Sequence, residues 1–395
     1  MAEKSVAGTS TTGKPAVLII GGLGYIGRFL ALYIHNNSLA SEVRLVDKVL
    51  PQLARLPPEF DEACHPSNFM QADASRPQSL DRIFAPTKAK HYSYVFNCGG
   101  ETRYSQDPSV YQLRNTQLST NLAEHCAKLE YKPALIEFST GMIYKPPGSS
   151  AVSSGGCTET APLKPWLKIS KAKLVGEEAL EKLAQSAGLR HATLRLAHVY
   201  GLYDTGFLSR GLCLARVYQS LDKEMKWLWG KDLRINTVYV NDVCAAAWAA
   251  AGWASINAPN SKTTMTDRAF NIVDDGDTSQ ESLAEHIAAI FGIQTGFQGN
   301  LISQFAKLNL DSVVDDVNED ILQPWADLIK AKGLEQGQGS PLTPFMEKEL
   351  IKDCNLCLNN KRAKSNLQWS LQKPRLTREE LKAIIESYER VRWWP

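Results

Sequence analysis

The segment that most constrains this chain is a glycine-rich turn between an apolar run and an amphipathic run. Residues 17–20 are apolar, glycines follow at Gly21, Gly24 and Gly27, and residues 25–34 have the apolar spacing of a helix. This order predicts a buried strand, a tight turn and a helix. The N-terminus of such a helix is electropositive, and glycines let a ligand approach the backbone closely, so the turn suits a pyrophosphate.

An acidic residue follows the next predicted strand. Glu42–Val46 has the pattern of a strand, and Asp47 comes directly after it. An acid at about this distance from a glycine turn hydrogen-bonds the ribose of a bound dinucleotide. The two features together predict a dinucleotide site, and the alternative is an ordinary strand–helix turn that binds no ligand.

Composition excludes several other classes of function. The chain has 395 residues and a net charge of +2, so we expect no nucleic acid and no membrane surface as the main partner. No run approaches the roughly 20 apolar residues that span a bilayer. Residues 1–14 are rich in Ser, Thr, Gly and Lys, and we expect a disordered tail there rather than a signal peptide.

The cysteines indicate a reducing compartment. Eight cysteines are scattered through a large chain, which suits reduced thiols and predicts a cytoplasmic protein. Cys354 and Cys357 form the one close pair. Because no second Cys or His pair follows them, we expect no metal site.

Strands and helices are predicted to alternate over residues 15–201. This alternation predicts an α/β fold with a doubly wound parallel sheet, Rossmann-like, whose ligands bind beyond the carboxyl ends of the strands. The strands are predicted at Ala16–Ile20, Glu42–Val46, Phe69–Gln71, Tyr94–Asn97, Leu135–Ser139 and Ala192–Leu196, and the later helices at Gln78–Phe84, Val110–Leu129 and Ser170–Ala187.

A different pattern follows over residues 202–395. We expect a smaller C-terminal substrate domain there, interleaved with the last strands of the sheet. Residues 295–350 are expected to be irregular, with Gly and Pro in 333–344. The other predicted elements are helices at Phe207–Leu221, Asp242–Trp253, Ser279–Phe291 and Thr377–Val391, and strands at Asn236–Val240 and Phe270–Val273.

Several segments together resemble the extended short-chain dehydrogenase/reductase family, also called the NAD-dependent epimerase/dehydratase family. The resemblance covers roughly residues 15–290. It rests on the glycine turn and Asp47, and on the order of the segments 97–100, 115–121, 138–144, 194–201 and 238–243. It implies NAD as cofactor, held by Gly21, Gly24, Tyr25, Ile26, Gly27, Asp47, Asp73, Cys98, Gly99, Asn115, Lys171 and His198.

The chemistry of that family needs a Tyr that transfers a proton, a Lys four residues later, and a Ser or Thr that hydrogen-bonds the substrate oxygen. Thr140 stands in the Ser/Thr place and Lys171 in the Lys place, so both are expected to be catalytic. The position four before Lys171 is Leu167, so the family's Tyr is missing. Three explanations stay open: another acid, a reaction that needs no Tyr, or binding without turnover. The other acids considered are Lys168, Tyr144, His198 and Tyr104.

The expected function is an NAD(P)-dependent oxidoreductase or epimerase/dehydratase-type enzyme acting on a small-molecule alcohol, ketone or sugar derivative. The main alternative is a non-catalytic NAD(P)-binding sensor or assembly protein, and a scaffold without cofactor is disfavoured by the glycine turn. Asp47 would repel a 2′-phosphate, so NAD is expected over NADP. A homodimer through two sheet-flanking helices is expected by family resemblance.

Two further pairs lie in the second half. Trp227 and Trp229 are expected to pack in the core or on the surface rather than to line a substrate pocket. Lys231 and Arg234 lie where the family often binds an anionic substrate group, which keeps a phosphate-bearing substrate as an alternative.

Overall fold

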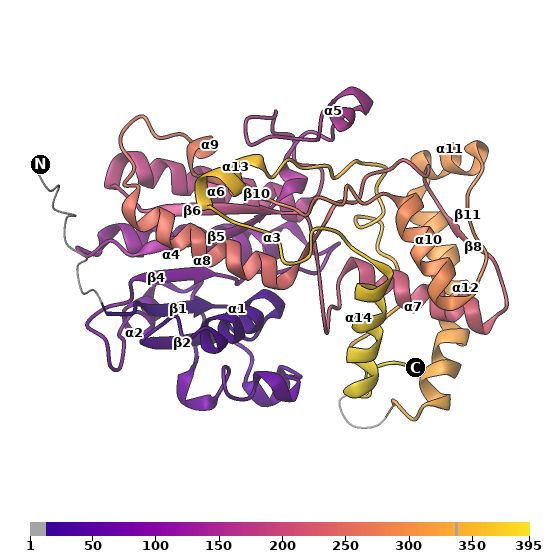
Figure 1. Cartoon of the computed structure of the whole chain (residues 1–395), viewed down its shortest axis with the longest axis horizontal. Coiled ribbons are helices and arrows are strands. Elements are labelled where there is room, and N and C mark those ends of the chain that lie inside the picture. Colours follow the sequence, from indigo (N-terminus) through magenta and orange to yellow (C-terminus); the bar gives the residue numbers. More distant parts are fainter. Residues whose placement is uncertain (1–12, 336–338) are drawn as a thin grey trace, which may run out of the picture.

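A seven-stranded parallel sheet forms the centre of the larger domain (Figure 1). The computed structural model describes residues 13–335 and 339–395. The strand order is β10-β6-β5-β4-β1-β2-β3, and every pair in it is parallel. The strands are β1 (Ala16–Ile20), β2 (Glu42–Asp47), β3 (Phe69–Gln71), β4 (Tyr94–Asn97), β5 (Ala134–Thr140), β6 (His191–Leu196) and β10 (Ala269–Ile272). The predicted Rossmann-like fold with a smaller C-terminal domain is confirmed.

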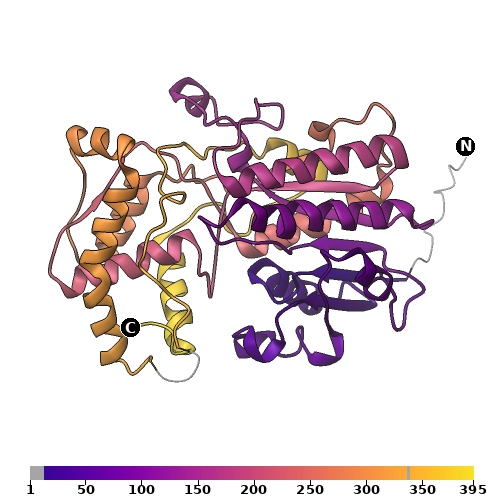
Figure 2. The same cartoon turned by 180° about the vertical axis from the view of Figure 1, so that it is seen from behind.

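Helices cover both faces of the sheet, because the central strands are buried on both sides and carry apolar residues in unbroken runs. One face packs against α1 (Tyr25–Asn36), α8 (Val240–Ile256) and α13 (Lys361–Leu367). The other face packs against α2 (Leu80–Ile83), α4 (Leu118–Lys128) and α6 (Lys168–Ala187), and α4 and α6 lie in front of the sheet in Figure 2.

The helix predicted over Val110–Leu129 is present in three parts. It begins as α3 (Pro108–Tyr111), widens to a π-helical segment, η5 (Gln112–Gln117), and continues as α4. The remaining short helices of this domain are α5 (Ser149–Ser153), α9 (Met265–Arg268) and the single turns η1 (Pro51–Leu53), η2 (Pro58–Phe60), η3 (Pro66–Asn68), η4 (Pro77–Ser79) and η6 (Gly141–Ile143).

The smaller domain has a separate apolar core (Figure 1). Its main helices are α7 (Phe207–Ser220), α10 (Gln280–Phe291), α11 (Asn300–Leu308), α12 (Leu310–Ala331) and α14 (Arg378–Arg390). Two small parallel pairs accompany them, formed by β7 (His198–Tyr200) with β9 (Thr237–Tyr239) and by β8 (Met225–Trp227) with β11 (Thr295–Phe297).

The expectation of irregular chain over residues 295–350 is wrong for its first part. Helices α11 and α12 occupy residues 300–331. On α12, Val314, Ile321 and Trp325 are buried at spacings of seven and four, which places them on one helical face. The glycines and prolines that suggested irregular chain lie in 333–344, after α12 ends.

The chain returns to the larger domain twice after residue 201. Strand β10 pairs with β6 at the edge of the sheet, and α13 packs against α8. The carboxylate of Asp242 on α8 accepts hydrogen bonds from the backbone N–H groups of Gln372 and Lys373 at 2.7 and 3.0 Å. The boundary at residue 201 stays a prediction, as does the tail at 1–14, whose residues 1–12 lie outside the described chain.

A buried ion pair joins α6 to β6. Nη2 of Arg195 lies 2.7 Å from Oε2 of Glu177, and the two side chains are 1% and 0% exposed. We expect Glu177→Gln to lower the free energy of unfolding by about 3 kcal/mol, because it leaves the Arg195 charge buried without its counter-ion. Urea unfolding followed by circular dichroism measures the change.

The matched control is Glu124→Gln on the exposed side of α4, which should change stability by less than about 0.5 kcal/mol. Equal effects of the two variants would contradict a structural role for the pair.

Candidate functional site

A groove of about 760 Å³ runs over the carboxyl ends of β1, β2, β4, β5 and β6. This is the edge at which parallel sheets of this kind bind ligands. Of the residues expected to contact a cofactor or to act in catalysis, the groove is lined by Gly21, Gly24, Tyr25, Ile26, Asp47, Asp73, Cys98, Gly99, Asn115, Thr140 and His198.

The glycine turn has the shape that a pyrophosphate needs. Gly21 has φ of +69°, and a side chain there would meet the backbone of Gly99. A Cβ on Gly27 would lie 2.2 Å from the Gly21 oxygen, so Gly27 serves helix–strand packing. Gly24 is the N-cap of α1, with no side-chain cap on the helix, and the open side of the turn faces the groove. The first N–H groups of α1 therefore have the arrangement that binds an anion.

Two carboxylates lie at the β2 and β3 ends of the groove. Oδ2 of Asp47 accepts from Leu23 N at 3.2 Å and Oδ1 accepts from Val49 N at 3.1 Å, which orients the carboxylate beside the glycine turn. Asp73 accepts from both the N–H and the hydroxyl of Ser75. Burial raises the pKa of Asp73, but these hydrogen bonds outweigh it and hold the pKa below its usual value.

The loop after β4 is held by Asn115. Its side-chain oxygen accepts from Glu101 N at 3.0 Å, and its amide nitrogen donates to the Glu101 oxygen at 3.1 Å. Asn115 is buried in η5 and fixes the path of residues 98–101 along the groove. The sequence placed Asn115 at the cofactor, and the structure adds this supporting contact.

The end of β5 carries two hydroxyls. Thr140 Oγ1 accepts from Met142 N at 3.2 Å, so its hydrogen is free to donate into the groove. Oγ of Ser139, beside it in the groove, is buried and has no hydrogen-bond partner among the described residues. Tyr25 OH and Asp204 Oδ2 are buried in the same way. Such orphaned groups fit a groove that a polar cofactor fills.

Of the lysines on α6, Lys173 lines the groove, whereas Lys171 is exposed and lies outside the groove-lining residues of the described chain. Residues two positions apart on a helix point about 200° apart around its axis, so Lys171 and Lys173 lie on different faces of α6. The ammonium of Lys173 lies 3.3 Å from Oε1 of Glu137, which is 2% exposed. The position four before Lys173 is Ile169, which also lines the groove, and Leu167 is the N-cap of α6 and is buried.

The alternative acids separate by position. His198 and Tyr104 line the groove, whereas Tyr144 and Lys168 lie outside its lining residues in the described chain. Tyr144 OH donates to Oδ1 of Asn271 at 2.8 Å and accepts from Arg195, so it is part of the buried network on β6. Burial lowers the pKa of His198 to about 4 and raises that of Tyr104 to about 12, where nearby Glu347 also raises it.

Lys231 and Arg234 are engaged elsewhere. Lys231 pairs with Glu281 at 3.0 Å and Arg234 with Asp277 at 2.9 Å, and neither lines the groove within the described chain. Arg103, Arg114 and Arg210 line it instead. Each of these arginines pairs with a glutamate, and the sequence had not singled out any of the three.

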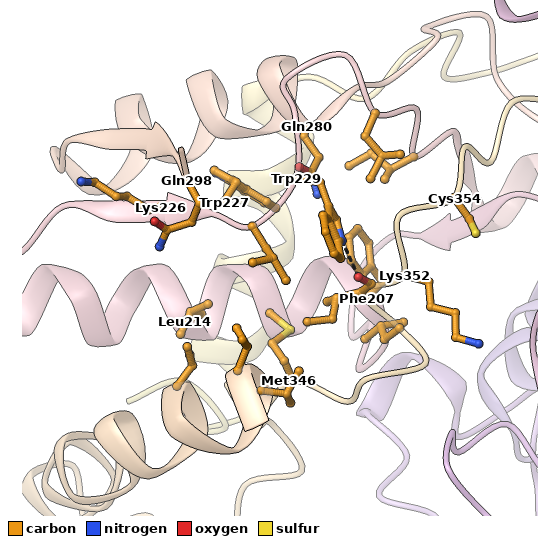
Figure 3. A pocket seen from close by; sticks show the side chains of 18 of the residues that line it. Phe207, Leu214, Lys226, Trp227, Trp229, Gln280, Gln298, Met346, Lys352 and Cys354 are labelled. Atoms are coloured by element: carbon orange, nitrogen blue, oxygen red, sulfur yellow. Dashed lines mark hydrogen bonds between the residues drawn. The ribbon is translucent and has the colours of Figure 1, made fainter. Parts of the chain in front are cut away.

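A second cavity, lined mainly by apolar residues, adjoins the groove in the smaller domain (Figure 3). Trp227 and Trp229 line it, although core or surface packing was expected for them. Met142, His198, Phe207 and Leu350 line both the cavity and the groove.

No group of three His, Cys, Asp or Glu side chains in residues 13–335 and 339–395 is arranged to hold a metal ion. In the same residues, no helix combines the length and apolarity needed to cross a membrane.

The model of the NAD dependent epimerase/dehydratase family matches residues 17–262. The chain belongs to this family. It is 22% identical over 275 residues to the decarboxylating sterol-4-alpha-carboxylate 3-dehydrogenase of Saccharomyces cerevisiae, covering 69% of this chain and 74% of that protein.

Two solved structures show the same fold. The UDP-glucose 4-epimerase of Thermotoga maritima, solved with UDP-glucose, has a TM-score of 0.61 and 19% identity over 95% of this chain and 99% of that chain. The UDP-glucose 4-epimerase of Thermus thermophilus, solved with NAD, has a TM-score of 0.61 and 17% identity over the same shares. The family is NAD-dependent by its description, and the fold extends over the C-terminal part of the chain as well.

Proposed function

We propose that this protein is an NAD-dependent enzyme that transfers a hydride between the cofactor and a small-molecule alcohol or ketone. The observation that carries the proposal is that one groove holds the uncapped glycine turn, Asp47, Thr140 and Lys173. Their order from β1 to α6 gives a cofactor site at one end and a reacting site at the other. Binding alone has little use for a free hydroxyl and a lysine at the reacting end.

Different residues of the groove would contact different parts of the cofactor. The first turn of α1 and Gly24 would hold the pyrophosphate, Asp47 the adenosine ribose, and Asp73 the adenine amine. Lys173 would hold the nicotinamide ribose, because it is the lysine of α6 that lines the groove. The bound nicotinamide ring supplies the carbon that accepts or gives up the hydride.

The proton at the substrate oxygen needs a source other than the family's Tyr. Ile169 lines the groove four residues before Lys173, and its side chain has no proton to transfer. Thr140 donates a hydrogen bond to the substrate oxygen, which stabilises charge there without transferring the proton. We infer that Tyr104, a phenol that lines the groove, is the proton donor when a ketone is reduced. Burial raises its pKa to about 12, which keeps it protonated at neutral pH but makes it a weak acid, so we expect proton transfer from it to be slow.

A non-catalytic NAD-binding protein is the second candidate function. Ile169 in the place of the phenol favours it, since general acid–base help contributes about 10²–10⁴-fold in rate. The two functions share the cofactor site and differ only in turnover.

An assay of hydride transfer distinguishes the enzyme from the non-catalytic NAD-binding protein. With NAD and a panel of primary, secondary and ring alcohols, we expect absorbance at 340 nm to rise with the wild-type protein. Thr140→Ala should reduce the rate about 10²-fold because it removes one donor at the developing oxyanion. Thr116→Ala, at a buried hydroxyl outside the groove lining, is the control that should retain the rate. Absence of turnover on every alcohol and on the matching ketones with NADH, with NAD bound normally, would favour the non-catalytic NAD-binding protein.

The two lysines of α6 offer a matched pair. Lys173→Ala should weaken NAD binding about tenfold, the loss of one charge-assisted hydrogen bond. Lys171→Ala should leave the dissociation constant unchanged, because its side chain is exposed on another face of the helix. Calorimetric titration of both variants measures the difference. If Lys171→Ala lowered the affinity for NAD more than Lys173→Ala, Lys171 would be the residue that contacts the cofactor.

Asp47 is expected to select NAD over NADP. Its carboxylate accepts from the ribose hydroxyls and repels a 2′-phosphate, so NAD should bind at least tenfold more tightly. Asp47→Asn should weaken NAD binding about tenfold and reduce the difference between the affinities for NAD and NADP. Calorimetry with both cofactors tests this, and Asp61→Asn at an exposed position is the control. Tighter binding of NADP by the wild type would refute the assignment.

A further inference from the structure

The cavity beside the groove, which we call the tryptophan cavity, has the size and the apolar lining to bind an apolar ring. It measures about 140 Å³ and lies between α7, α10, α12 and the segment from β8 to Ile235. Its walls are formed by Phe207, Leu214, Met225, Trp227, Trp229, Val314 and Met346, among others. Apolar cavities of about 150 Å³ hold a benzene-sized molecule, so this volume suits one ring of a larger ligand.

The charges at the tryptophan cavity are turned away from it. Lys226 lies beside Glu224, with the ammonium 3.2 Å from the carboxylate, and the Lys352 ammonium donates to the Trp166 oxygen at 2.9 Å. Figure 3 shows their ammonium groups at opposite edges of the cavity, pointing outward. The described lining contains no arginine and no acid. A diphosphate placed here would find no cation directed at it, and burying it unpaired is costly.

Two residues that line the tryptophan cavity, Gln280 and Trp227, each have a buried polar atom without a partner among the described residues. Oε1 of Gln280 is buried without a hydrogen bond to any described residue, and the whole residue is 7% exposed. Nε1 of Trp227 is buried and unpartnered in the same way. By contrast, Nε1 of Trp229 donates to the Ile351 oxygen. One atom needs a donor and the other needs an acceptor, and a hydroxyl group provides both.

The tryptophan cavity adjoins the end of the groove that contains Thr140. Met142 and His198 line both spaces, and Met142 N donates to Thr140 Oγ1. The His198 ring stacks on Phe207 with centroids 4.5 Å apart. This shared wall lies next to Thr140, so a ligand whose reacting carbon lies there would reach the cavity past these rings.

We propose that the substrate is an apolar, ring-bearing alcohol or ketone whose ring occupies the tryptophan cavity and whose second hydroxyl meets Gln280 and Trp227. This rests on the proposed function for the reacting end, whereas the cavity's preference for an apolar hydroxylated ring does not. A nucleotide sugar is disfavoured by the same lining, because its diphosphate and hydroxyls would be left unpaired against apolar walls.

Three probes test the inference: 2-naphthol, naphthalene and UDP-glucose, each titrated into the full-length protein both with NAD present and without it, after NAD binding itself has been measured. Quenching of tryptophan fluorescence and calorimetry report binding. We expect 2-naphthol to bind about tenfold more tightly than naphthalene, because it satisfies the buried amide. Gln280→Leu should abolish this preference. Gln298→Leu, at the less buried glutamine of the same cavity, should retain it.

Filling the tryptophan cavity provides the second arm. Leu214→Trp on α7 and Val317→Phe on α12 should each block 2-naphthol while leaving NAD affinity unchanged, since neither residue lines the groove. Two variants on different helices guard against one failing to fold.

The outcomes separate the two proposals. Binding of 2-naphthol with the Gln280-dependent preference, but no binding of NAD, would overturn the proposed function and leave the cavity assignment standing. Binding of UDP-glucose that the filling variants abolish, or equal binding of 2-naphthol and naphthalene by the wild type, would overturn the substrate class while NAD binding stands.

Discussion

The buried carboxylate of Glu137 holds the reacting end of the groove together. It accepts from Asn97 Nδ2 on β4 at 2.6 Å and from Ser119 Oγ on α4 at 2.9 Å, and the Lys173 ammonium on α6 lies 3.3 Å away. A charge this deep is stable only when it is paired and hydrogen-bonded. The network therefore ties two strands and two helices at one point, and it orients the lysine that we assign to the cofactor.

The central sheet and the glycine turn could be predicted from sequence because both depend on local patterns. Unbroken apolar runs indicate strands buried on both faces. The glycine spacing indicates a turn in which Gly21 lies against the backbone of Gly99 and Gly27 lies against the Gly21 oxygen. The lysine of α6 that lines the groove could not be located in this way. Lys171 and Lys173 stand in the same helix, and only the packing of α6 against β5 determines which of them faces the groove.

In the second half, α7, α8, α10 and α14 were predicted from their apolar spacing, whereas α11 and α12 were missed beside the glycines and prolines of residues 333–344. The α12 helix does carry apolar residues at helical spacing, and its buried face contacts α7, about 100 residues earlier in the chain. Trp227 and Trp229 carry no local sign that they border a cavity, since the facing residues come from α7, α10 and α12. Side chains that meet only when helices distant in the sequence pack together leave no periodic signal in one segment of sequence.

The return of the chain from the smaller domain has a consequence for synthesis. The nucleotide-binding sheet is one body in space, but its edge strand β10 and the helix α13 that packs on α8 come from residues 269–272 and 361–367. The buried carboxylate of Asp242 gains its hydrogen bonds from the N–H groups of Gln372 and Lys373 only after residues about 130 positions later have been synthesised. A ribosome that has released only the first 200 residues has therefore produced a sheet with an unpaired edge and an uncovered apolar face. Such a nascent chain exposes an unpaired strand edge together with apolar surface, the two features that favour aggregation of partly folded chains.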